Sequence, residues 1–119
     1  MIDLKAMTRE THHRITGQDN SAVLDSIRFL HRAGRLHEVR LLVIEGLTDS
    51  EEELAAYAGF VDGLDPGVRL RLLAFRHHGV REHGRAWPET APDTMHRVAR
   101  TLGGMELANV MVTEAALLP

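Results

Sequence analysis

The stretch that decides the fold runs from residue 38 to residue 75 and reads EVRLLVIEGLTDSEEELAAYAGFVDGLDPGVRLRLLAF. It opens with an aliphatic and β-branched run, residues 38–44, which is typical of a largely buried strand. Ser50, followed three residues later by Glu53, is a capping pattern for a helix whose apolar residues share one face. An Asp-Pro-Gly turn then precedes a second strand, residues 68–75. The stretch therefore predicts a strand, a helix and a strand.

The same alternation continues on both sides of this unit. Upstream, apolar residues at helical spacing predict a helix over residues 21–33, and residues 2–5 resemble the stub of an earlier strand. Downstream, a proline opens a predicted helix over residues 92–102, and residues 107–112 predict a short closing strand. The order is typical of a βα barrel or a doubly wound sheet. We therefore expect an α/β fold with parallel strands and flanking helices, formed by one domain over residues 1–119.

The first predicted strand begins at residue 2, which leaves almost no chain upstream to pair with it. In a parallel sheet this leaves an open edge, and open hydrophobic edges favour association with another chain. A domain of this length buries roughly two thirds of its unfolded surface, with little surplus when an edge is open. We therefore expect self-association through the sheet edge, or stability that depends on a partner.

Composition excludes several classes of function. The 14 basic residues are scattered among 17 acidic ones, for a net charge of -3, so there is no basic stripe for nucleic acid. No apolar run approaches the ~18 residues of a membrane span, and the first residues lack the apolar core of a signal peptide, which favours a cytoplasmic protein. Cysteine is absent, which excludes disulfides, zinc-thiolate sites, thiol nucleophiles and a cysteine-ligated iron-sulfur cluster within this chain.

Eight histidines invite a metal hypothesis, and several of them fall in the segment HHGVREHGRAWPETA. His77, His78 and His83 are near two carboxylates in sequence, Glu82 and Glu89. Their spacing matches neither HExxH nor a paired zinc motif. A solvated or substrate-contacting loop is the favoured interpretation, and a metal-dependent enzyme is the least favoured of the alternatives.

Several spaced motifs carry a family resemblance, in one order from Asp3 to Val112. They are Asp3-Leu4-Lys5 followed by His12, Gly17 and Asn20; VRLLVIEGLTDS at residues 39–50; RLLAFRHHG at residues 71–79; and Thr94-Met95 followed by Arg97-Val98. In these motifs the chain resembles the C-terminal half of radical S-adenosylmethionine (radical-SAM) activating enzymes of the pyruvate formate-lyase activase type.

The resemblance implies half of a partial (βα)6 TIM-like barrel whose strand ends hold S-adenosylmethionine. It also implies a four-iron four-sulfur cluster, bound by a cysteine-bearing N-terminal half that this sequence does not contain. In the complete enzyme a 5'-deoxyadenosyl radical would abstract hydrogen from a backbone glycine of a glycyl radical enzyme. The implied partners are that N-terminal half and the target enzyme, and the chain alone would not be competent.

The resemblance also assigns individual residues. Lys5 and Arg40 match cofactor-binding residues, and Asp3 matches an aspartate associated with a monovalent cation. Arg76 stands where the family has a cofactor-contacting histidine, and Glu45 where it commonly has a proline, so the adenosine end of the site departs from the family pattern. Cations suit the cofactor's carboxylate, because they form charge-assisted hydrogen bonds with it. No catalytic residue is assigned within this half.

Two interpretations of these residues remain open. Charges such as Asp3 and Lys5 in a terminal stub are solvated in most proteins, whereas Arg40 lies inside an apolar strand and needs a partner. Because side chains alternate along a strand, we expect Arg40 to point toward the barrel interior, opposite to Leu41. The partner of Arg40 is either the cofactor or a carboxylate of the chain in a structural ion pair. The alternative function is a non-enzymatic protein-interaction or cofactor-binding module derived from such a barrel. A cysteine-rich reading frame directly upstream would favour the divided enzyme.

Overall fold

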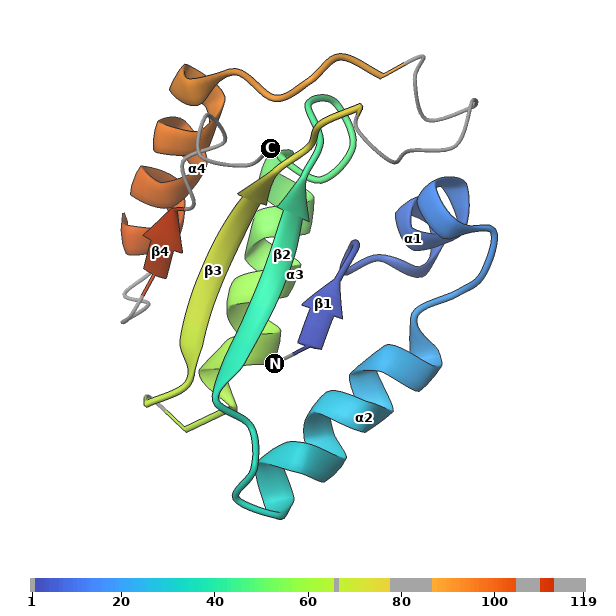
Figure 1. The fold of residues 1–119 in the computed structure, drawn as a ribbon, viewed down its shortest axis with the longest axis vertical. Helices are drawn as coiled ribbons and strands as arrows, with labels where there is room; N and C mark the ends of the chain where they lie inside the picture. The colour runs from blue at the N-terminus through green and yellow to red at the C-terminus, as the bar shows by residue number, and fades with distance from the viewer. Residues whose placement is uncertain (1, 66, 78–86, 105–109, 113–119) are drawn as a thin grey trace.

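The computed structural model describes residues 2–65, 67–77, 87–104 and 110–112, and within them strands alternate with helices (Figure 1). In chain order the elements are β1 (Ile2–Leu4), α1 (Arg9–Thr16), α2 (Ser21–Arg32), β2 (Glu38–Val43), α3 (Glu51–Asp62), β3 (Arg69–Ala74), α4 (Pro92–Gly104) and β4 (Val110–Val112). None of the helices among these residues is long and apolar enough to cross a membrane.

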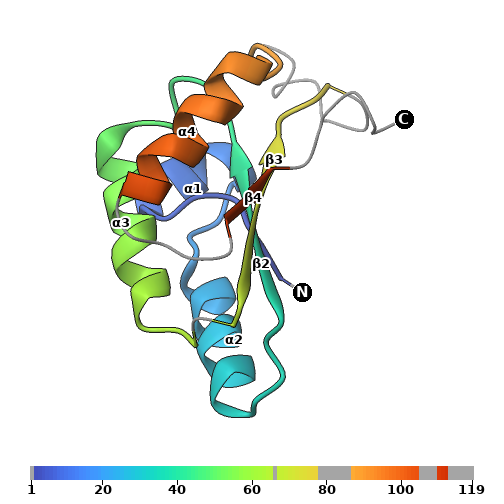
Figure 2. The ribbon, with the colours of Figure 1, turned by 90° about the vertical axis from the view of Figure 1, so that its left-hand side faces the viewer.

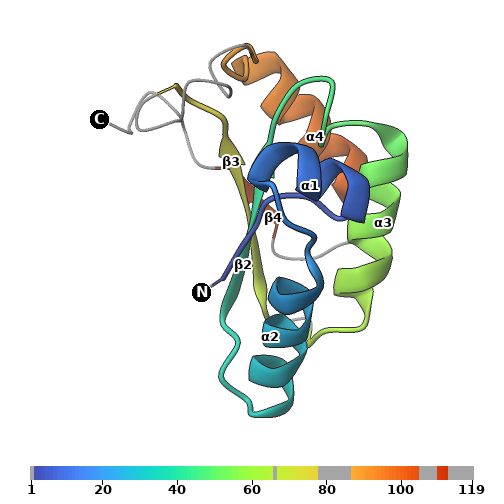
Figure 3. The ribbon, with the colours of Figure 1, turned by 90° about the vertical axis from the view of Figure 1, so that its right-hand side faces the viewer.

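The strands form one parallel sheet in the order β1-β2-β3-β4. The helices all lie on one face of this sheet, which Figures 2 and 3 show edge-on from its two sides. A doubly wound sheet has helices on both faces, whereas the wall of a barrel has them only outside. The predicted α/β class and the parallel strands are confirmed, and the one-sided cover is that of a partial barrel.

Alternation along the strands separates a buried apolar face from a more exposed face that carries the charged residues. Leu4, Leu41 and Leu72 are buried against the helices, while Asp3 and Arg40 lie on the other face, which we call the open face. This confirms the expectation that Arg40 lies opposite to Leu41. The core between sheet and helices also includes Ile27 of α2, Leu54 and Tyr57 of α3, and Met95, Val98 and Leu102 of α4.

One helix was not predicted from the sequence. α1 has eight residues, and only His12 among them is buried, so it lacks the apolar period that reveals a helix. Its ends follow local rules: the Thr8 side chain accepts a hydrogen bond from Thr11 N, and Gly17 has a φ of 80°, the left-handed conformation that glycine adopts without strain.

The ends of the predicted elements shift by one or two residues. β2 and β3 each end one residue early, and α4 continues two residues past its predicted end, through the glycine pair at residues 103–104. The last strand is confirmed at Val110–Val112, and residues 107–109 of that prediction lie outside the described part of the chain. In the described sheet, β1 and β4 are the two edge strands.

Candidate functional site

The open face of the sheet carries a group of arginines around one carboxylate, which we call the Glu38 cluster. Glu38 is 4% exposed, and its carboxylate accepts hydrogen bonds from Nε of Arg40 at 2.8 Å and Nε of Arg71 at 3.2 Å. Nε of Arg69 lies 3.7 Å from the same carboxylate. The arginine side chains keep between 25% and 56% of their surface exposed, so the cluster is buried at its centre and open at its rim.

The strand register produces this cluster. Arg40 is directly opposite Arg71 in the ladder between β2 and β3, and Glu38 is opposite Arg69. Like charges directly opposite each other destabilise a sheet, so the shared carboxylate offsets their repulsion. The hydrogen bond from Arg40 lowers the pKa of Glu38, and the bond from Arg71 adds to this effect, while burial opposes it. The net result is a lowered pKa, so the carboxylate is ionised at neutral pH.

A pH titration tests the role of Glu38. Because its pKa is below the ordinary value of 4.5, Glu38 stabilises the fold above that pH and loses this contribution as the pH falls through the lowered value. We expect Glu38→Gln to be less stable than the wild type at pH 7, with the difference shrinking below pH 4.5. Urea unfolding between pH 7 and pH 3 measures it, and a difference that stays constant would contradict the assignment.

Asp3 lies in β1, the strand next to β2 and its Glu38 cluster, and Lys5 directly follows β1. Lys5 Nζ is 3.8 Å from Asp3 Oδ2, and both side chains are close to half exposed. The register places Asp3 directly opposite Arg40. Two of the four predicted site residues, Asp3 and Arg40, therefore lie on neighbouring strands and share the open face. Lys5 directly follows the strand that carries Asp3.

His12 and Asn20, which follow Asp3 and Lys5 in the same motif, hold the backbone after β1. The amide of Asn20 donates to the carbonyl oxygens of Ala6 at 3.3 Å and Met7 at 2.6 Å. Nδ1 of the buried His12 lies 2.7 Å from the Gln18 carbonyl oxygen. These hydrogen bonds fix the path of the chain that follows β1 and Lys5.

Glu53 links two distant segments in this region, and its role was not predicted. Its buried carboxylate accepts hydrogen bonds from Met7 N at 2.9 Å, Thr8 N at 3.1 Å and the Thr8 hydroxyl. The capping pattern predicted that it pairs with Ser50, and the backbone half of that prediction holds, since Glu53 N donates to Ser50 Oγ. Its side chain instead joins α3 to the start of α1, a contact between distant segments that no local pattern reveals.

Arg76, the fourth predicted residue, follows β3 and braces the backbone. Its Nη1 donates to the carbonyl oxygens of Phe75 at 3.0 Å and Thr90 at 2.9 Å. The buried Thr90 in turn bonds through its hydroxyl to the Val43 carbonyl oxygen and accepts from Phe75 N. Arg76 therefore helps to fasten the segment before α4 to the carboxyl ends of β2 and β3. The Glu38 cluster lies nearer the start of β3, at Arg69 and Arg71.

The histidine segment is only partly described. His77 N donates to a Glu89 carboxylate oxygen at 2.8 Å, and His77 Nε2 is 2.6 Å from the Trp87 carbonyl oxygen. His78, Glu82 and His83 lie outside the described residues. Within the described part of the chain, no group of three or more histidine or carboxylate side chains could hold a metal ion.

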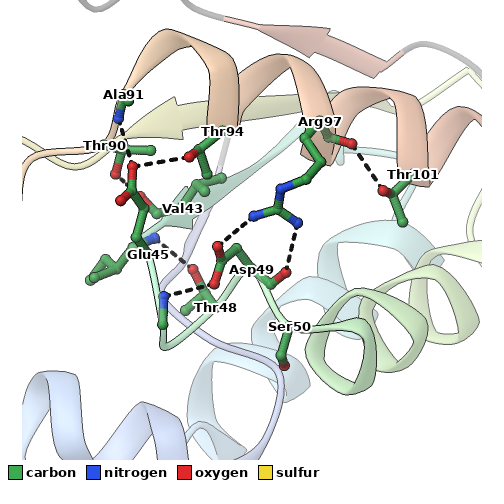
Figure 4. Close-up of polar contacts among 12 residues, drawn as sticks. Val43, Glu45, Thr48, Asp49, Ser50, Thr90, Ala91, Thr94, Arg97 and Thr101 are labelled. Atoms are coloured by element: carbon green, nitrogen blue, oxygen red, sulfur yellow. Dashed lines mark hydrogen bonds and ion pairs between the residues drawn. The ribbon is translucent and has the colours of Figure 1, made fainter.

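Glu45, in the loop after β2, caps the last helix (Figure 4). Its Oε1 accepts from Ala91 N at 2.8 Å and the Thr94 hydroxyl at 3.0 Å, at the start of α4. Asp49 in the same loop accepts from Arg97 Nη2 at 2.6 Å. A carboxylate at a helix N-terminus satisfies backbone N–H groups and the helix dipole. Glu45 and Asp49 thus tie the loop after β2 to α4.

Comparison with known proteins finds relatives of this chain by sequence. No family model matches the chain. Over 103 residues it is 29% identical to a pyruvate formate-lyase-activating enzyme of Streptococcus mutans. This alignment covers 82% of this chain and 39% of the relative. The chain resembles one part of the pyruvate formate-lyase-activating enzymes. The enzyme of Staphylococcus epidermidis is 24% identical over 82 residues, or 69% of this chain and 33% of the relative. The chain thus spans well under half the length of these curated relatives.

Solved structures support the same fold. A domain of a pyruvate formate-lyase-activating enzyme from Bacteroides vulgatus superposes with a TM-score of 0.74 at 19% identity, covering 95% of this chain and 66% of that one. A radical SAM methyltransferase from Sphaerobacter thermophilus superposes with a TM-score of 0.66 at 13% identity, covering 97% of this chain and 34% of that one. At these identities the likeness establishes the fold, a parallel sheet covered by helices on its outer side.

Proposed function

We propose that this chain supplies one wall of the cofactor site in an enzyme of the radical-SAM activating type. The observation that carries the proposal is the likeness to activating enzymes across most of the chain, combined with basic side chains on the open face of the sheet. The proposed target is a glycyl radical enzyme, whose backbone glycine loses a hydrogen atom. In this proposal the chain binds and orients, and a cysteine-bearing N-terminal part completes the site.

The basic residues fit S-adenosylmethionine by the chemistry of their donors. Lys5 and Arg40 are both partly exposed, and each offers N–H groups that suit the methionyl carboxylate. The Glu38 carboxylate holds Nε of Arg40, which orients its guanidinium in advance of binding. Asp3 would hold the monovalent cation that the family resemblance assigns to it. The bound cofactor supplies the radical chemistry, while these residues fix its position.

Arg76 differs from Lys5 and Arg40 because part of its guanidinium already has backbone partners. Its Nη1 already donates to two backbone carbonyl oxygens, so contact with the adenosine end would use the rest of the guanidinium. A family histidine at this place would have neither the reach nor the number of donors to brace the backbone in this way. We propose that Arg76 does both: it holds the end of β3 and borders the cofactor.

The iron-sulfur cluster does not fit this chain, because its ligands are thiolates and the sequence has no cysteine. We expect iron and sulfide reconstitution of this chain alone to yield no stable cluster. Reconstitution after co-expression with a cysteine-bearing N-terminal part should yield one, together with calorimetrically detectable S-adenosylmethionine binding. A reducible four-iron cluster on the pure chain, or an assembled pair that does not bind the cofactor, would overturn the proposed function.

A second candidate function is a non-enzymatic interaction module derived from the same barrel. The bonds of Arg40 to Glu38 and of Arg76 to backbone carbonyls favour it, because both arginines already have structural partners. Such a module would bind another protein through an open sheet edge and would not bind S-adenosylmethionine in any assembly. The same calorimetric measurement separates the two candidates.

A further inference from the structure

The two β3 arginines of the Glu38 cluster contact a different oxygen atom from Arg40. Nε of Arg71 at 3.2 Å and Nε of Arg69 at 3.7 Å both lie next to Oε1 of Glu38. Nε of Arg40 instead donates to Oε2 of the same carboxylate at 2.8 Å. The two guanidinium groups of β3 thus converge on one oxygen atom of a buried carboxylate, which holds them close together on the open face.

A single carboxylate cannot neutralise the whole cluster. Glu38 carries one negative charge, and within the described residues no other carboxylate lies within ion-pair distance of Arg40 or Arg69. At least one positive charge is therefore left over, whatever the other contacts of Arg71. Like charges held on neighbouring strands destabilise a sheet, so a bound anion would offset the remaining repulsion.

Arg69 is the member of the cluster best placed to take that anion. Its side chain is 56% exposed, its contact with Glu38 is an ion pair at 3.7 Å, and it makes no side-chain hydrogen bond to another described residue. A guanidinium offers five N–H donors in a planar fork that matches the oxygen atoms of phosphate and carboxylate groups. Arg71, two residues along the same strand and on the same face, adds a second positive charge.

We propose that Arg69 and Arg71 form an anion site for a small polyvalent oxyanion, of which inorganic phosphate is the simplest. A polyvalent ligand is favoured because its oxygen atoms can accept from both guanidinium groups at once. The site goes beyond the proposed function and does not depend on it. Barrel chemistry takes place at the carboxyl ends of strands, whereas Arg69 stands at the start of β3, at the lower end of the sheet in Figure 1.

Phosphate titration of the full 119-residue chain tests the site. Inorganic phosphate is added at constant ionic strength, and binding is followed by amide chemical shifts in nuclear magnetic resonance. We expect saturable binding with a Kd on the order of 1 mM. Arg69→Met should weaken it by about tenfold or more, through the loss of a charge-assisted hydrogen bond. Arg69→Gln, a polar but uncharged replacement, should weaken it to the same extent.

Arg14→Met is the matched control, because it removes the same charge from an exposed position on α1, outside the cluster. We expect it to change the Kd by less than about twofold, since exposed charges away from the site are screened by salt. Equal unfolding midpoints of all variants without phosphate would show that their folding is unaffected.

Each result decides for or against the anion site. No saturable binding by the wild type, unchanged affinity in the Arg69 variants, or an equal loss in Arg14→Met would overturn it. Binding that Arg40→Met abolishes and Arg69→Met retains would place the anion at Arg40 and would also overturn it. The titration uses no cofactor, so an assembled pair that binds no S-adenosylmethionine would refute the proposed function and leave the anion site standing.

Discussion

Replacing Glu53 with alanine is expected to destabilise the chain by about 3 kcal/mol, because it leaves three partly buried donors without an acceptor. The carboxylate accepts from two backbone N–H groups and a hydroxyl at the start of α1, so its loss detaches this helix from α3. In a domain with open sheet edges, a loss of this size is a large fraction of the total stability. Urea unfolding followed by circular dichroism measures it.

The neighbouring residue provides a control for this prediction. Glu52 is exposed on the same turn of α3, so Glu52→Ala removes the same charge without removing the buried contacts. We expect Glu52→Ala to change the stability by less than about 0.5 kcal/mol, as for ordinary surface substitutions. Glu53→Gln should fall between the two, because an amide oxygen can still accept from the backbone. Equal effects of the two alanine variants would refute the bridging role of Glu53.

The second large effect is expected at Arg40. In the assembled two-part protein, Arg40→Met should weaken S-adenosylmethionine binding by on the order of 1.5 to 3 kcal/mol, the range for a hydrogen bond to a charged group. That corresponds to about 10- to 150-fold in the dissociation constant. The cost in stability should be smaller than for a broken isolated pair, because Glu38 keeps its bond from Arg71 at 3.2 Å.

Arg69 is the matched control for Arg40. It lies 3.7 Å from the same carboxylate but is more exposed, at 56% against 32% for Arg40. Exposed ion pairs contribute little, so Arg69→Met should leave both cofactor affinity and stability nearly unchanged. Calorimetry and denaturant unfolding are measured on the same preparations. If Arg40→Met leaves affinity unchanged and lowers stability by several kcal/mol, Arg40 belongs to a structural ion pair alone.

Local patterns in the sequence predicted most of the fold. Apolar runs located β2 and β3 to within one residue at each end, and helical spacing predicted α3 between them, because burial on one or both faces leaves a period in the sequence. The helix α1 was not predicted, because only His12 among its residues is buried. It is held in place by Glu53, which contacts Thr8 from 45 residues further along the chain. A helix fixed by one distant carboxylate has no periodic signal of its own.

The candidate site was predictable only in part. Alternation in β2 placed Arg40 on the face opposite Leu41, and the structure confirms that placement. Its partner Glu38 was not predicted, because the cluster depends on the register between β2 and β3, which brings Arg71 to the same carboxylate. The roles of Lys5, Arg76 and Asp3 in binding remain predictions.

The formation of 5'-deoxyadenosine tests the central claim most directly. The chain is co-expressed with a cysteine-bearing N-terminal part, the pair is reconstituted anaerobically with iron and sulfide, and S-adenosylmethionine is added with a reductant. We predict that the pair forms 5'-deoxyadenosine, that neither part alone does so, and that Arg40→Met in the pair lowers the yield at limiting cofactor. A pair that assembles with an intact cluster and forms no 5'-deoxyadenosine would contradict the account.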